Sequence, residues 1–441
     1  MFARHRFVLA AAVCAAALAA SAPSATAQTT GLREAADAAM VNFGAATTVA
    51  TLADGAYTQL LIDNVNMIST VDEVDFAVVQ PQPGVFDFAA PDLLIDFAAA
   101  EGLTARGHGL ISRDGLPEWI LNGTWTPETL AQVLTDHVTA VVSRYAERNP
   151  GVVTQWDVVD EAFLPDGTPR DSIWRQVIGD DYIRIAFEAA RAADPDALLF
   201  YDDFYDDLSV TQDAVDNGVA VVPGATASNS TCDGVAKCVG VRNAITALAA
   251  AGVPIDGIGL QAHLLSPDPL DYSTFSTWID DLGLRWAITE FDVPVPVTEI
   301  ANPQSLAFQA DTYATVLSSC LDSPSCNTFV TWGITDRLPP TPRDGAFGGA
   351  LWFDQSDAPK PAVDAMSAVL VSSATVVTTE PPTTTAAPAT PDTTRPAADG
   401  VTTGDDSSTA VGVIIGAGTL CAIAIIIVVL RRRRPTNEAE R

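Results

Sequence analysis

The chain has 441 residues, with 55 acidic and 23 basic side chains, which gives a formal net charge of −32. Such a surface repels polyanions, so nucleic acid is excluded as a partner class. A neutral polysaccharide is not affected by this charge and stays open as a ligand.

The first 27 residues have the pattern of a secretory signal peptide. Basic residues at 4–6 precede an alanine-rich apolar run, and the small residues Ala25 and Ala27 fit a signal peptidase site. A retained N-terminal anchor is the alternative, but the apolar run is short for a membrane span. We therefore expect the mature chain to begin near Gln28.

The composition changes again after residue 371. Residues 372–410 are rich in Thr, Pro, Ala and Asp, and they offer too little apolar surface to fold, so they predict an extended stalk. Residues 411–430 carry no charge and are long enough for one transmembrane helix. Four arginines follow at once and place residues 431–441 in the cytoplasm. The sequence thus predicts a single-pass cell-surface protein whose folded part lies outside the cell.

Four cysteines of the extracellular part form two pairs, Cys232 with Cys238 and Cys320 with Cys326. In an oxidising compartment, this spacing predicts two short-loop disulfides. No histidine or further cysteine lies beside either pair in the sequence, so a zinc site is not expected. We expect no cofactor and no metal.

Residues 30–371 alternate between strand-like and helix-like segments. Strand-like runs of β-branched or apolar residues lie at 41–45, 65–69, 104–110, 153–159, 198–201, 257–261, 285–289 and 328–333. Amphipathic helices are expected between several of them, including 89–101, 127–147 and 181–193. Eight strands alternating with helices predict a single α/β domain, a (β/α)8 TIM barrel.

Such a barrel carries its chemistry at the carboxyl ends of its strands. Polar residues do follow the expected strands: His108, Asp160, Glu161, Asp202, Asp203, His263, Glu290, Asp292 and Trp332. Acids that only solvate a surface would instead be scattered along helices. Glu161 and Glu290 meet the needs of glycosidic hydrolysis, in which one carboxylic acid protonates the leaving oxygen and a second carboxylate attacks or activates water.

Six motifs support this interpretation. They are RGHGL at 106–110, WDVVDEA at 156–162, GIGLQAHL at 257–264, ITEFD at 288–292, TWGITD at 331–336 and LWFDQSDAPKPAVDAM at 351–366. In this order they resemble glycoside hydrolase family 10, the endo-β-1,4-xylanases, over about residues 43–366. The resemblance implies a retaining endo-acting hydrolase of β-1,4-xylan or a related β-linked polysaccharide. We also expect a monomer.

The resemblance also implies roles for single residues. Glu161 matches the general acid/base and Glu290 the nucleophile, while His263, with Asp292 beside it, matches the histidine that supports the nucleophile. The matches to substrate-binding positions are His108, Asp160, Asp203, Gln261 and Trp332. The Cys320–Cys326 pair resembles a disulfide of many family members.

The chain also departs from the family. Asp160 replaces an asparagine whose amide donates to a sugar hydroxyl, and an ionised aspartate can only accept. The lysine and asparagine that grip the sugar on the glycone side are absent from residues 70–76, and a tryptophan is lost near Arg113. Arg113 either meets an acidic substituent such as a uronate or pairs with Asp160, and we favour the ion pair.

Two alternatives stay open. The aspartates at 202, 203, 206 and 207 allow a calcium site, although the EF-hand spacing and glycine are missing. The fold also suits a non-catalytic carbohydrate-binding protein of the cell surface or a transglycosylase. Retention of Glu161, Glu290, His263 and Asp292 favours the hydrolase, and a retaining mechanism predicts carboxyl groups about 5–5.5 Å apart.

Overall fold

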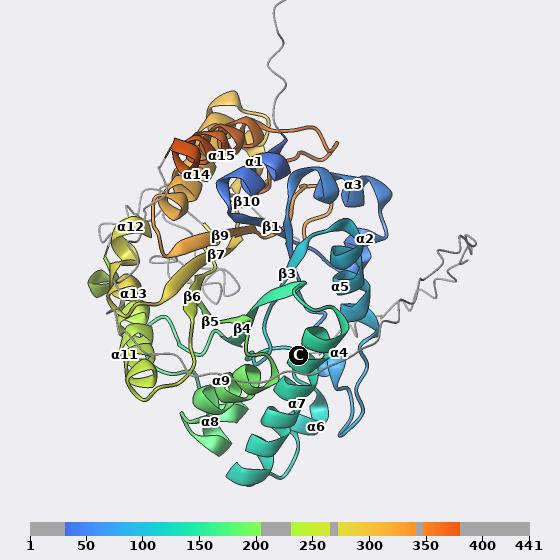
Figure 1. Cartoon of the computed structure of the whole chain (residues 1–441), viewed down its shortest axis with the longest axis vertical. Coiled ribbons are helices and arrows are strands. Elements are labelled where there is room, and N and C mark those ends of the chain that lie inside the picture. Colours follow the sequence, from blue (N-terminus) through green and yellow to red (C-terminus); the bar gives the residue numbers. More distant parts are fainter. Residues whose placement is uncertain (1–30, 204–230, 265–271, 341–346, 380–441) are drawn as a thin grey trace, which may run out of the picture. The chain divides into compact units, whose positions relative to one another are not determined.

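The computed structural model describes residues 31–203, 231–264, 272–340 and 347–379. Parallel strands close into a barrel in the order β1-β2-β3-β4-β5-β6-β7-β9, and helices surround it (Figure 1). The strands are β1 Asn42–Ala46, β2 Met67–Ser69, β3 Thr104–Gly107, β4 Val153–Asp160, β5 Leu198–Asp203, β6 Gly257–Leu260, β7 Arg285–Phe291 and β9 Cys326–Thr331. The predicted TIM barrel is confirmed, and every expected strand is present with shifts of a few residues at its ends.

The helices of the described chain are α1 Leu32–Ala39, α2 Val49–Leu52, α3 Gly55–Asn64, α4 Phe76–Val79, α5 Ala89–Glu101, α6 Glu118–Leu121, α7 Pro127–Arg148, α8 Ile173–Ile178, α9 Tyr182–Ala193, α11 Ala236–Ala250, α12 Tyr272–Phe275, α13 Thr277–Asp281, α14 Pro303–Leu321 and α15 Pro361–Thr379. Local sequence sets their ends. Thr126 accepts a hydrogen bond from the Thr129 N–H and, with Pro127 in the first turn, starts α7. Gly102, with φ 65°, ends α5 in the left-handed conformation that glycine adopts readily. The predicted helices at 89–101, 127–147 and 181–193 correspond to α5, α7 and α9.

Two glycines in the strands allow close packing beneath the site. A Cβ atom at Gly107 would lie 2.1 Å from the Trp156 ring, and one at Gly259 would lie 1.8 Å from Oδ1 of Asp202. Real Cβ atoms do not come this close to another heavy atom. Glycine is therefore required on β3 and β6 for Trp156 and Asp202 to hold their positions.

Both predicted disulfides, Cys232–Cys238 and Cys320–Cys326, are confirmed. The first links the short 3-10 helix η1 (Cys232–Gly234) to α11, and the second links the end of α14 to the start of β9. A small antiparallel sheet of β8 (Val295–Pro296) and β10 (Phe347–Gly348), which the sequence did not indicate, lies after β7, and a second 3-10 helix, η2 (Val297–Glu299), follows β8.

The last helix, α15, extends past residue 371, the predicted end of the barrel domain. Its buried residues Ala362, Met366 and Leu370 recur every four positions, and no proline stops the helix before Pro381. No helix of the described residues is long and apolar enough to cross a membrane. The predicted signal peptide 1–27, most of the stalk 372–410, the span 411–430 and the tail 431–441 lie outside the described residues.

Candidate active site

Glu161 follows β4 on an uncommon backbone conformation. Its φ is 49°, in the left-handed region that few non-glycine residues adopt, and such strain costs about 1–3 kcal/mol and clusters at functional sites. Its N–H donates to the carbonyl of Asp202 at 3.0 Å, which ties the turn to β5. The tip of β4 therefore holds the Glu161 carboxyl group in one place.

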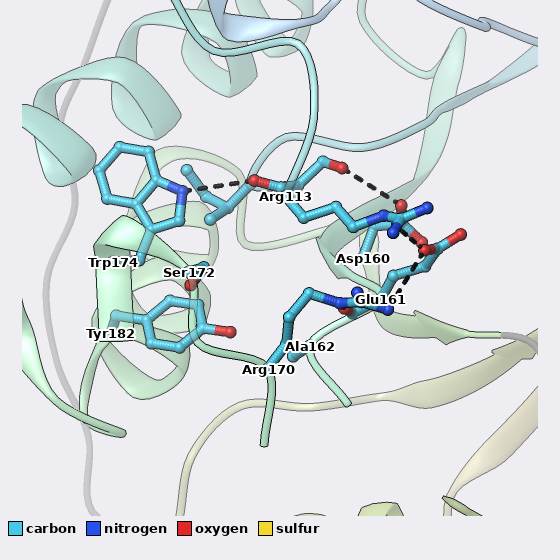
Figure 2. Close-up of a pocket in the computed structure, with 10 residues that line it drawn as sticks. Arg113, Asp160, Glu161, Ala162, Arg170, Ser172, Trp174 and Tyr182 are labelled. Atoms are coloured by element: carbon cyan, nitrogen blue, oxygen red, sulfur yellow. Dashed lines mark hydrogen bonds and ion pairs between the residues drawn. The ribbon is translucent and has the colours of Figure 1, made fainter. Parts of the chain in front are cut away.

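Two arginines approach the Glu161 carboxylate (Figure 2). Arg113 Nε lies 2.9 Å from Oε2, and Arg170 Nη2 lies 3.9 Å from the same oxygen. Arg170 Nε also donates to the Glu161 carbonyl at 3.0 Å. The ion pair that we predicted between Arg113 and Asp160 is thus formed with the next residue instead, because the turn after β4 brings the Glu161 carboxylate to the guanidinium.

Glu290 is the penultimate residue of β7, and its side chain is only 5% exposed. His263, after β6, places Nε2 2.8 Å from Oε2 of Glu290 and Nδ1 3.2 Å from Oδ1 of Asp292. Burial lowers the pKa of His263, but the Asp292 and Glu290 carboxylates outweigh it and raise that pKa to about 10. His263 is therefore an imidazolium at neutral pH, and its two ring nitrogens join Glu290 to Asp292.

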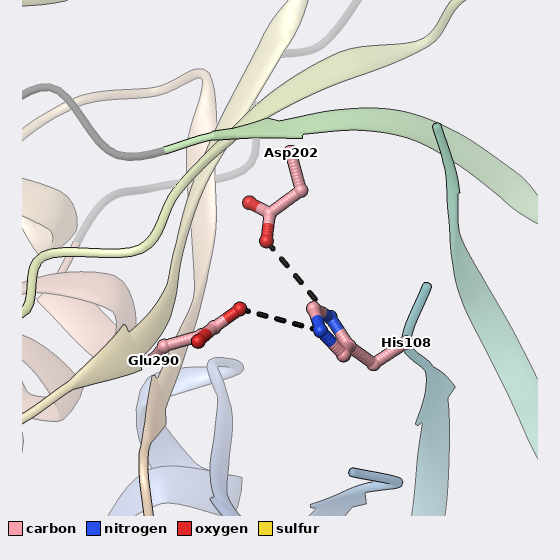
Figure 3. A group of neighbouring side chains, drawn as sticks. All are labelled: His108, Asp202 and Glu290. Carbon is pink, nitrogen blue, oxygen red and sulfur yellow. Dashed lines mark ion pairs between the residues drawn. The ribbon is translucent and has the colours of Figure 1, made fainter. Parts of the chain in front are cut away.

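His108 lies between Glu290 and Asp202 (Figure 3). Its Nε2 is 3.5 Å from Oε1 of Glu290, and its Nδ1 is 3.9 Å from Oδ2 of Asp202 and 3.1 Å from Oδ2 of Asp157. Burial opposes the charge on His108, but Glu290 and Asp157 raise its pKa well above 6.5. The side chains of His108, Asp202 and Glu290 form an ion-pair network in which one ligand atom of each lies within 4.8 Å of the others.

Arg106 and Asp157 form a buried ion pair beneath these groups, and both side chains are fully buried. Arg106 Nε donates to Oδ2 of Asp157 at 2.9 Å, and the guanidinium also lies over the Phe200 ring at 4.5 Å. Burial tends to raise the pKa of Asp157, but Arg106 and His108 outweigh it, and that pKa is lowered. Asp157 consequently stays ionised and holds His108 in place from below.

Asp203, predicted to bind substrate, is fully buried. It pairs with Lys237 of α11 and accepts a hydrogen bond from the Tyr201 hydroxyl at 2.5 Å. Burial raises the pKa of Asp203 to about 6, although Lys237 acts in the opposite direction. Asp206 and Asp207, the other members of the considered calcium site, lie outside the described residues.

Gln261 connects two acids of the site. Its Nε2 donates to Oδ1 of Asp160 at 3.1 Å and lies 3.4 Å from Oε1 of Glu161. Trp332 follows β9 and meets the rings of His108 and His263 edge-on, with centroids 5.3 and 5.8 Å away. The structure therefore brings the sequence-predicted residues of six strand ends together at one mouth of the barrel.

Two recesses border the predicted catalytic residues. One is narrow and is lined by Arg113, Glu161, Trp174 and Tyr182 (Figure 2). The other, of about 590 Å³, is lined by residues that include Asp292 and Trp332. The second recess leaves open space next to Asp292 and Trp332.

Four of these side chains are not among the residues predicted from the sequence. Arg106 and Asp157 lie inside quoted motifs, and a charged residue within a barrel strand was the signal that could have found them. Lys237 is one of only two lysines in the chain, and both lysines are buried and paired with an aspartate. No sequence signal pointed to Arg170 as a neighbour of Glu161.

A TIM barrel with one glutamate after β4 and a second, histidine-supported glutamate on β7 defines a two-carboxylate glycosidase. Comparison with known proteins agrees: the model of glycosyl hydrolase family 10 matches residues 31–235 and 227–369. The chain belongs to this family and is a glycoside hydrolase.

Several relatives of the chain have been named as enzymes or have solved structures. Endo-1,4-beta-xylanase C of Phanerodontia chrysosporium is 32% identical over 332 residues, which are 74% of this chain and 75% of the relative. Endo-1,4-beta-xylanase A of Fusarium oxysporum is 33% identical over 68% of this chain and 87% of its own length. Xylanase 10B of Thermotoga petrophila, solved in complex with xylobiose, has a TM-score of 0.68 and 31% identity, and the match covers 79% of this chain and 99% of the xylanase.

Proposed function

We propose that the protein is an endo-acting xylanase that cleaves β-1,4-xylan or a closely related β-linked polysaccharide with retention of anomeric configuration. The observation that carries this proposal is the state of Glu290. One of its oxygens, Oε2, is held by His263 at 2.8 Å, while the other, Oε1, is buried and accepts no hydrogen bond from the described residues. Oε1 has only the longer 3.5 Å ion-pair contact with His108, so we infer that Glu290 is oriented through Oε2 and reacts through Oε1.

In the first step, Glu161 as a carboxylic acid donates its proton to the glycosidic oxygen, and Glu290 attacks the anomeric carbon. The bond from that carbon to the leaving oxygen breaks, and a glycosyl ester with Glu290 forms. In the second step, Glu161 as a carboxylate takes a proton from water, and the hydroxyl attacks the same carbon and releases Glu290. His263 holds Glu290 at 2.8 Å in the free protein, and Asp292 at 3.2 Å is a second partner that keeps the His263 ring in place when Glu290 becomes an ester.

The polymer class rests on the relatives. The curated relatives given above are named endo-1,4-beta-xylanases, and the solved one from Thermotoga petrophila holds xylobiose. The open recess beside Asp292 and Trp332 offers space for a sugar next to the catalytic groups. Arg113, which pairs with Glu161, is a local difference that favours a test on acidic as well as neutral polymers.

The test is release of reducing sugars from a panel of xylans, mixed-linkage glucans and uronate-bearing polymers. Glu290→Gln and Glu161→Gln should each remove release while circular dichroism and the thermal midpoint show a folded protein. Asp364→Asn, at an exposed carboxylate on α15, is the matched control and should release sugar at the wild-type rate. A folded wild-type protein that binds a polymer but releases nothing would instead support the carbohydrate-binding alternative, and products longer than the substrate would support a transglycosylase.

We further propose that the enzyme is a monomer, secreted and tethered to the cell surface by residues 411–430, with the stalk as a spacer. The support is the uncharged run followed by four arginines. The full chain should stay with membranes after alkaline extraction, and a chain that ends at residue 410 should appear in the medium. Equal distribution of the two chains would contradict tethering.

A further inference from the structure

Asp160, the last residue of β4, differs from the other acids at the barrel mouth. Its side chain is buried beside Glu161 (Figure 2). Gln261 Nε2 donates to Oδ1 at 3.1 Å, and Ser112 Oγ lies 3.5 Å from Oδ2. Among the residues that the structure describes, no arginine, lysine or histidine nitrogen lies within ion-pair distance of Asp160.

The neighbouring carboxyl groups each have a nearby cation. The pairs are Glu161 with Arg113, Asp157 with Arg106, Asp203 with Lys237, Asp202 with His108, and Glu290 and Asp292 with His263. An ionised carboxylate that is buried without a cation costs several kcal/mol, and the group avoids this cost by keeping its proton.

We propose that Asp160 is held as a neutral carboxylic acid whose O–H donates a hydrogen bond to a hydroxyl of the sugar at the cleavage point. The proposal rests on the proposed glycosidase function and deepens it, because Asp160 becomes a specificity-determining residue of that site. Oδ1 accepts from Gln261 at 3.1 Å, whereas Oδ2 has only the longer 3.5 Å contact with the Ser112 hydroxyl, which can turn to accept instead, so the proton belongs on Oδ2. A neutral carboxylic acid has one donor, whereas a carboxylate has none.

The charges around Asp160 agree with this assignment. Burial is the main cause that raises the pKa of Asp160 well above its ordinary value, and the negative charge of Glu161 adds to it whenever Glu161 is ionised, with Glu290 on β7 and Asp203 on β5 acting in the same direction. His108 after β3 acts against them. The other two contacts, Gln261 after β6 and Ser112, carry no charge.

Two consequences follow. At pH values where Asp160 keeps its proton, its O–H donates a hydrogen bond to the sugar hydroxyl. When Asp160 ionises, the donor is lost and a negative charge faces the sugar, so activity falls. An asparagine at this position cannot ionise and always offers two N–H donors.

The experiment compares the full-length wild type with Asp160→Asn and Asp160→Leu. We expect kcat/KM of Asp160→Asn on xylan to lie within about threefold of wild type at acidic pH, and the ratio of variant to wild type to rise at least about tenfold as pH increases. Loss of a hydrogen bond to a substrate hydroxyl should lower kcat/KM of Asp160→Leu by about 10- to 100-fold. A ratio for Asp160→Asn that stays below about one tenth at every pH would show that the ionised aspartate is needed and would overturn the proposal.

A second measurement tests the protonation state of Asp160 in the absence of substrate. A group whose folded pKa is raised adds stability that is complete below its unfolded pKa and is lost as pH rises through the folded pKa. The urea midpoint of Asp160→Asn should therefore increase relative to wild type as pH rises from about 4 upward, whereas that of the control Asp364→Asn should not. A difference in urea midpoint between Asp160→Asn and wild type that does not change with pH would show that Asp160 is not held as a neutral acid. A wild type that releases no sugar would refute the proposed function, and this stability result would still decide the state of Asp160.

Discussion

Replacing His263 by glutamine tests whether an imidazolium supports the nucleophile. Glutamine keeps a hydrogen-bond donor of similar length but carries no charge at any pH. His263 contacts Glu290 at 2.8 Å and Asp292 at 3.2 Å, and its pKa rises from 6.5 to about 10 in the folded protein. Because the folded pKa is raised, the stability from these contacts is complete below pH 6.5 and is lost as pH rises through about 10.

The size of this contribution follows from the two pKa values. At 1.36 kcal/mol per pKa unit, the difference between 6.5 and about 10 corresponds to about 5 kcal/mol of unfolding free energy. Wild type should therefore exceed His263→Gln in stability by several kcal/mol near neutral pH, and this excess should fall towards zero near pH 10.

Urea unfolding followed by tryptophan fluorescence between pH 7 and 10 measures this difference. His137→Gln is the matched control, because His137 is buried against the Phe76 ring and burial lowers its pKa to about 3, so it is neutral throughout this range. Its difference from wild type should not change with pH. If the difference in unfolding free energy between wild type and His263→Gln also stays constant between pH 7 and 10, His263 is not a cation in the folded protein.

Two further predictions concern stability. Arg106→Met leaves the buried Asp157 carboxylate without its main cation and should lower the unfolding free energy by about 3–5 kcal/mol, whereas the double variant Arg106→Met/Asp157→Leu should lose less. Urea unfolding measures both variants. An Arg106→Met protein as stable as wild type would contradict the role of the ion pair. Replacing Cys320 and Cys326 by serine should lower the unfolding free energy by about 2 kcal/mol, because the loop that the disulfide closes is short. The thermal midpoint measures this loss, and a variant with the midpoint of the oxidised wild type would contradict the prediction.

Much of the barrel could be predicted because its signals are local. Helix α5 begins and ends where the sequence predicts, since an amphipathic run is followed by Gly102. Strand positions were also predicted closely, but β4 and β7 are longer than expected and carry Asp160 and Glu290 within the strand. The short β8–β10 pair depends on contacts between segments far apart in sequence, which no local pattern reports.

The candidate site could be located from sequence, but its pairings could not. Strand ends meet at one mouth of a barrel, so the acids and histidines were expected together. The partner of Arg113 was assigned one residue too early, because sequence does not indicate a positive φ at Glu161. Lys237 reaches Asp203 from a helix more than thirty positions away, and only the three-dimensional structure brings them together.

In the proposed mechanism, Glu161 and Glu290 perform a double displacement. The direct measurement is the anomeric configuration of the first product released from a xylan oligosaccharide, followed by proton NMR before mutarotation. Because double displacement retains configuration, the β anomer should appear first and the α anomer only later, as the sugar equilibrates. An α anomer that appears first would mean inversion and would contradict Glu290 as a covalent nucleophile.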